Sequence, residues 1–118
     1  MSWDIFLNCP HCGRSLPVEN HTEGGTYAVG GTDAAILNVT YNYGKHFREG
    51  IGYTDGFREW LDGKRASEVA EQLTQAVAQL GTQVEDDYWQ ATAGNAGHAL
   101  SILLGWARKH PDGVFEVV

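Results

Sequence analysis

The strongest constraint on the fold comes from two segments in the second half of the chain whose apolar residues recur at helical spacing. Residues 66–80 carry one apolar stripe, and either Ser67 or Asp62 is the expected N-terminal cap. Residues 93–109 form the second predicted helix, with Thr92 as its cap. We expect both helices to cover one face of a sheet.

Strands are predicted at both ends of the chain. Residues 3–8 largely alternate apolar and polar side chains, and residues 114–118 follow a Pro-Asp-Gly turn. Residues 26–29 and 35–41 are further candidates, and the Gly-rich link between them predicts a hairpin. The amino-terminal and carboxyl-terminal strands are expected to be neighbours.

The remaining segments complete a predicted α+β fold. Residues 9–25 are rich in turn formers and predict a loop, and residues 43–49 predict a short helix. The expected architecture is a small antiparallel sheet that includes both terminal strands, covered by the two long helices. Residues 1–118 form one domain in this prediction.

Composition excludes some classes of function. The chain has 118 residues, of which 42% are hydrophobic, and this is enough for a core without metal or disulfide staples. Its net charge of -7 argues against nonspecific nucleic-acid binding, although a few local donors can still hold a nucleotide. With no apolar run near the roughly 20 residues of a membrane span, we expect a cytoplasmic protein without membrane contact.

The two cysteines occur in the sequence CPHCG. The spacing of Cys9 and Cys12 suits a zinc knuckle, because the turn lets two thiolates meet one ion. A structural zinc site needs four ligands, and no second CxxC is present. The other ligands would have to come from among His11, His21, Glu23, Asp33 and His46. The alternative is a pair of reduced cysteines in a tight turn.

A polar ladder is predicted in the segment that follows the central apolar run. Asn38, Thr40 and Asn42 alternate, so one strand would place them on a single face suited to a polar ligand. The alternative is a solvated strand face. Tyr43 and His46 follow closely, and His46 is either an acid–base group or an ordinary hydrogen-bonded histidine.

A third candidate is the start of the second long helix. Small residues after Thr92, including Asn95, would expose backbone N–H groups that favour an anion. Close packing between helices is the alternative explanation. Trp89, just before this helix, is either a stacking surface for a ligand or a core aromatic.

Four short patterns carry a resemblance to a known family. They are NVTYN at 38–42, DDYW at 86–89, GNA at 94–96 and HPDG at 110–113. With them, most of the chain from about His21 resembles a family of small uncharacterised proteins of tailed bacteriophages and prophages, which has no established activity. The resemblance implies an accessory protein in the cytoplasm of a bacterial host.

These observations favour a non-enzymatic binding module for a small polar ligand, such as a nucleotide used in host defence, or for a host protein. One alternative is a zinc-containing hydrolase or nucleotide-modifying enzyme that uses Cys9, Cys12 and His46. Another is a structural or assembly protein. Both the binding module and the structural protein are compatible with a homo-oligomer.

Overall fold

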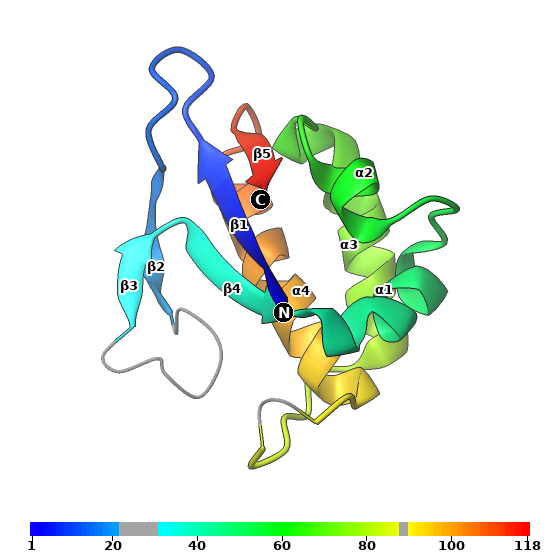
Figure 1. Ribbon diagram of the computed structural model, residues 1–118. Helices are drawn as coiled ribbons and strands as arrows, with labels where there is room; N and C mark the ends of the chain where they lie inside the picture. Colours follow the sequence, from blue (N-terminus) through cyan, green and yellow to red (C-terminus); the bar gives the residue numbers. More distant parts are fainter. Residues whose placement is uncertain (22–30, 88–89) are drawn as a thin grey trace.

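The protein is built on a three-stranded antiparallel sheet whose central strand is the first in the chain. The structure, a computed structural model, describes residues 1–21, 31–87 and 90–118. Strand β1 (Ser2–Asn8) lies between β4 (Ile36–Thr40) and β5 (Val114–Val117). The predicted pairing of the amino-terminal and carboxyl-terminal strands is therefore confirmed (Figure 1).

One face of this sheet forms the floor of the core. In the register, Ile5 lies opposite both Leu37 and Val117. Alternate residues of the three strands point inward and are at most 1% exposed: Ile5, Leu7, Leu37, Val39, Phe115 and Val117. All helices lie on this side in Figure 1. The opposite face carries the exposed side chains of Asp4 and Glu116, and none of the described helices covers it.

The two long helices have the predicted bounds. Helix α3 spans Ala66–Leu80 and α4 spans Ala93–Lys109, and Thr92 caps α4 by accepting a hydrogen bond from the backbone of Asn95. Among the described residues, no helix is both long enough and apolar enough to cross a bilayer.

The predicted cap of α3 is wrong. Arg65 is the N-cap residue, and its backbone N–H donates to the side chain of Glu68 at 3.2 Å. Asp62 instead accepts a hydrogen bond from the backbone N–H of Val117 at 2.9 Å, which ties the loop before α3 to strand β5. Ser67 lies inside the helix.

Several elements differ from the expectation for the first half of the chain. The predicted 9–25 loop contains a strand, and the predicted short helix begins after a turn of 3-10 helix. The elements of the chain not yet described are β2 (Pro17–His21), β3 (Thr32–Ala34), η1 (Tyr41–Tyr43), α1 (Gly44–Ile51), which is the predicted short helix, and α2 (Phe57–Leu61). Strand β3 pairs with β2, so two residues of the expected hairpin link, Thr32 and Asp33, are themselves in a strand. The other predicted arm, 26–29, lies outside the described residues.

Glycines in α4 allow the chain after α3 to pass very close to this helix. A Cβ atom added to Gly97 would collide with the backbone carbonyl oxygen of Gly81. One added to Gly94 would collide with the carbonyl oxygen of Gln83. The small residues at the start of α4 therefore serve close packing, because no larger side chain fits against this backbone.

We expect Gly97→Ala to lower the free energy of unfolding by about 1–3 kcal/mol, because the added methyl group would overpack the contact with Gly81. Gly105→Ala is the matched control on the same helix. An added Cβ there meets nothing within 4 Å, so it should stabilise the protein by up to about 1 kcal/mol. Urea denaturation of both variants tests this difference, and equal effects would show that the contact with Gly81 is not tight.

Candidate functional site

The predicted polar ladder does not form, because strand β4 ends at Thr40. Asn42 belongs to η1, and the hydroxyl oxygen of Thr40 accepts a hydrogen bond from its backbone N–H at 3.3 Å. Asn38 lies on the open face of the sheet and donates to Ser2 Oγ at 2.8 Å and Asp4 Oδ1 at 2.9 Å. The three residues therefore present no common surface.

Tyr43, His46 and Trp89 have different surroundings. Tyr43 is fully buried in the core, where its ring packs edge-on against Phe47. His46 lies on α1, and its Nε2 is 3.0 Å from the carbonyl oxygen of Ala91, just before α4. Trp89 lies outside the described residues. The structure thus gives His46 the role of joining two segments.

The start of α4 is occupied by the protein's own chain. Asn95 is buried, and its Oδ1 accepts a hydrogen bond from the backbone N–H of Glu85 at 2.8 Å. Its Nδ2 donates to the carbonyl oxygens of Asp87 and Gln90, both at 3.0 Å. These hydrogen bonds hold the chain around Glu85 and Asp87 against the start of α4, which leaves less room there for an anion.

Cys9 and Cys12 lie in a tight turn that directly follows β1. The turn is closed by a hydrogen bond from the N–H of Gly13 to the carbonyl oxygen of Cys9, at 2.9 Å. The pKa of the Cys9 thiol is lowered, because the backbone N–H of Cys12, then that of His11, and then the Cys12 thiol hydrogen-bond to its sulfur.

The structure does not bring His46 close to these cysteines. The turn lies at one end of β1, whereas α1, which carries His46, lies beyond its other end (Figure 1). In the described ranges 1–21, 31–87 and 90–118, no three His, Cys, Asp or Glu side chains come close enough to hold a metal ion.

A hollow of about 520 Å³ opens beside the start of β1, and we call it the aromatic hollow. Four aromatic residues and two cations line it together with two glycines. The lining residues are Trp3, Tyr41, Gly44, Lys45, Arg48, Tyr53, Gly56 and Phe57. None of these described lining residues carries a carboxylate, although the chain as a whole has a net charge of -7.

Neighbouring contacts hold the aromatic groups of this hollow in place. The Trp3 ring centroid is 4.7 Å from that of Tyr41 and 4.9 Å from that of Phe57. Tyr53 donates its hydroxyl hydrogen to the carbonyl oxygen of Gly44 at 3.1 Å. Burial raises the pKa of Tyr53, so its hydroxyl stays protonated and keeps this bond at neutral pH.

The two cations come from one face of α1. Lys45 and Arg48 are three residues apart, a spacing that places side chains next to each other on a helix. The Arg48 guanidinium carbon lies 5.5 Å from the centroid of the Tyr53 ring, and Nη2 of Arg48 is 3.4 Å from the carbonyl oxygen of Asp55. Arg48 is therefore oriented before any ligand arrives.

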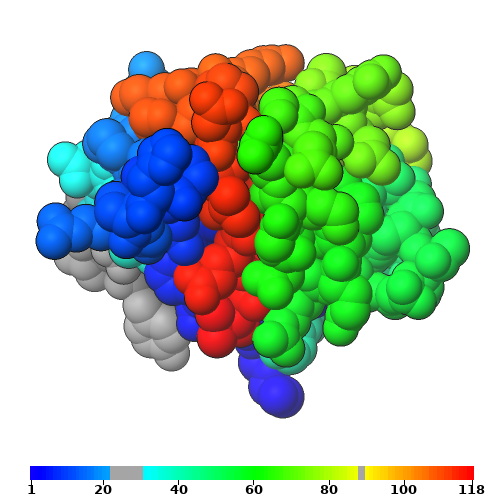
Figure 2. Space-filling model, turned by 90° about the horizontal axis from the view of Figure 1, so that it is seen from above, coloured from blue at the N-terminus to red at the C-terminus, as the bar shows by residue number. Residues whose placement is uncertain are grey.

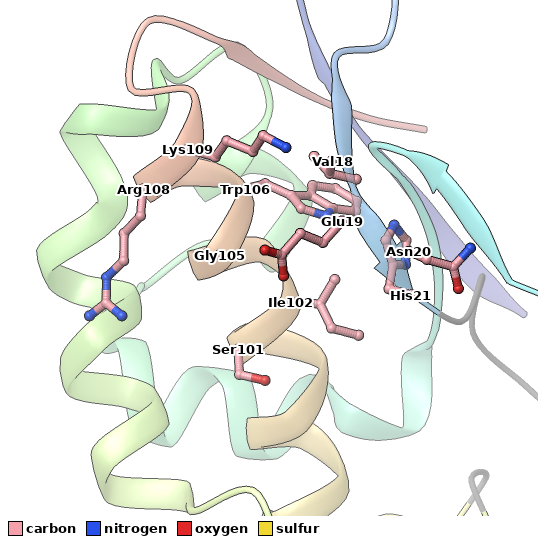
Figure 3. A pocket seen from close by; sticks show the side chains of 10 residues that line it. All are labelled: Val18, Glu19, Asn20, His21, Ser101, Ile102, Gly105, Trp106, Arg108 and Lys109. Carbon is pink, nitrogen blue, oxygen red and sulfur yellow. The ribbon is translucent and has the colours of Figure 1, made fainter.

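A second hollow of about 600 Å³ lies between β2 and α4 (Figure 3). Trp106 and Ile102 form an apolar floor, and the His21 ring centroid is 5.2 Å from that of Trp106. Glu19 and Lys109 both line it, so charges of both signs meet there. This mixture indicates no single class of ligand.

Only part of the aromatic hollow could be predicted from the sequence. Tyr41 and Lys45 belong to the polar-aromatic segment that follows the central apolar run, but Trp3, Tyr53 and Phe57 come from other parts of the chain. The i, i+3 spacing of Lys45 and Arg48 on a short predicted helix was the available signal.

Comparisons with protein-family models, with curated proteins and with solved structures gave no match to this chain. The resemblance to proteins of tailed bacteriophages therefore stays a prediction.

Asn95→Ala should destabilise the protein by roughly 1.5–4.5 kcal/mol, because three hydrogen bonds of a buried side chain are lost. Hydrogen exchange of the Glu85 amide, which donates to Asn95, should accelerate as well. Gln75→Ala, at an exposed position of α3, should change stability by less than about 0.5 kcal/mol. An unchanged exchange rate at Glu85 in the Asn95 variant would show that this side chain does not hold the segment.

Proposed function

We propose that the protein is a non-enzymatic binding module for a phosphorylated nucleoside, and that the ligand occupies the aromatic hollow. The observation that carries the proposal is the combination of four aromatic residues and two cations, without a lining carboxylate, in an acidic chain. A volume of about 520 Å³ is within the range of small-molecule sites, roughly 300–1,000 Å³.

The aromatic side supports recognition of a base. Tyr41 is 43% exposed although it contacts Trp3, so part of its ring is open to a stacking partner. Stacking accepts any base, because every base has a π face. The hollow therefore suits the class of nucleotides better than it distinguishes among the bases.

The basic side supports recognition of a phosphate. Lys45 and Arg48 are both exposed cations. Arginine presents a planar fork of N–H donors that matches phosphate oxygens, and Arg48 is already held over Tyr53. A ligand with both a base and a phosphate would contact the two sides together, which favours it over a nucleoside or a free phosphate.

Membership of a bacteriophage family would give this binding a purpose. A small protein that captures a nucleotide can remove a signal that a host uses in defence, and it needs no catalytic group to do so. This part of the proposal depends on the resemblance of the sequence patterns.

Isothermal titration calorimetry with AMP, GMP, adenosine and inorganic phosphate tests the proposal. We expect AMP or GMP to bind, and adenosine and phosphate each to bind more weakly. Arg48→Gln should weaken nucleotide binding about tenfold or more, since a charge-assisted contact is lost. Tyr41→Ala should weaken it by roughly 5- to 150-fold through lost stacking.

Arg108→Gln is the matched control, because it removes one exposed cation from the last turn of α4 rather than from the aromatic hollow. It should leave nucleotide affinity unchanged. Equal losses in the Arg48 and Arg108 variants would mean that only overall charge matters. Failure of both nucleotides to bind would overturn the proposal.

A further inference from the structure

The turn at residues 9–14, which we call the cysteine turn, has the features of one half of a metal site. The N–H of Cys9 donates to the carbonyl oxygen of Arg14 at 2.8 Å, and the N–H of Gly13 donates to the carbonyl oxygen of Cys9 at 2.9 Å, so the chain reverses between the two cysteines. A turn with this spacing lets two thiolates, the form in which cysteine binds metal, meet one ion. Gly13 has φ 74°, a conformation that favours glycine and lets the turn close tightly.

Two thiolates do not complete a zinc site. Structural zinc is nearly always bound by four ligands in a tetrahedron. Within the part of the chain that the structure describes, no third His, Cys, Asp or Glu side chain joins Cys9 and Cys12 in a group that could hold a metal ion. A second molecule that carries the same pair of cysteines would supply the two missing ligands.

The cysteine turn is placed where another molecule can reach it. It lies beyond the end of β1 and projects from the sheet (Figure 1). Seen from above, it stands beside the last turn of α4 and β5 on the outside of the molecule (Figure 2). Residues 10–14, which include Cys12, are all exposed.

We propose that a second copy of this chain completes the site, so that one zinc ion joins two chains through Cys9 and Cys12 of each. Four thiols lose their protons to solvent when the ion binds, and the resulting centre carries two negative charges. Each copy supplies an identical pair of ligands, as a symmetric contact between two chains requires.

The charges around the cysteine turn suit such a centre. Arg14 lies within the turn, and Lys109 lines a small hollow together with Pro10. Asp112 lines the same hollow and opposes them in part. Two cations per chain beside a doubly negative zinc centre reduce the repulsion between two acidic molecules.

Native mass spectrometry and size-exclusion chromatography of the reduced, metal-free protein, with zinc added stepwise, test the proposal. We expect a dimer that contains one zinc ion for two chains and that a strong chelator returns to monomers. Titration with Co²⁺ should reach its end point at half an equivalent per chain, with the charge-transfer absorption of a tetrathiolate site.

Cys12→Ser should abolish zinc-dependent dimerisation, and it should not disturb folding because this side chain is exposed. His11→Ala is the control within the same turn and should dimerise as the unaltered chain does. One zinc ion bound per monomer, a dimer that persists in the Cys12 variant, or no zinc binding under reducing conditions would each overturn the proposal. None of these results bears on nucleotide binding, which is measured in the metal-free protein.

Discussion

The position of β1 between two antiparallel partners is the constraint on which the rest of the structure depends. Ile5 lies opposite Leu37 on one side and Val117 on the other, so one residue fixes the register of all three strands. The same strand places Trp3 in the aromatic hollow and leads directly into Cys9. At about 3.3 Å per residue, these two positions lie roughly 20 Å apart. A slip of one residue would move both and turn the core side chains outward.

Elements with a strong local pattern were predictable from the sequence, and elements that depend on distant partners were not. Helices α3 and α4 bury long apolar stripes, and their bounds follow from local periodicity. Strand β2 has a proline and three polar residues, which is a poor strand sequence. It is a strand because β3 pairs with it and because Nε2 of His110 lies 2.6 Å from the carbonyl oxygen of Pro17. Both β3 and His110 are too far from residues 17–21 in the sequence to be taken into account by a local pattern.

The roles of single side chains in the candidate sites also depend on distant partners, so they could not be predicted from local sequence. The polar ladder required β4 to continue past Thr40, but the hydroxyl of that residue bonds to the backbone of Asn42 and starts a helical turn. The open helix start required Asn95 to face solvent, but it is buried and bonded to a segment as far back as Glu85. A polar side chain in a sequence can serve a ligand or the backbone, and only the fold decides between them. The aromatic hollow was missed for the opposite reason, because it collects residues from separate segments.

The net charge of -7 does not indicate which ligands the protein can bind, because binding depends on the local distribution of charge. Lys45 and Arg48 form one exposed cationic group, Arg14 lies within the cysteine turn, and Lys109 lines a hollow together with Pro10 of that turn. Added salt should therefore affect nucleotide binding and zinc-dependent dimerisation differently. Ions screen exposed charges beyond about 10 Å at 0.1 M, so added salt weakens the attraction of a phosphate to Lys45 and Arg48. The same screening reduces the long-range repulsion between two acidic chains, while the short bonds from zinc to sulfur are hardly affected. Dimerisation should therefore tolerate or gain from salt under conditions in which nucleotide affinity falls.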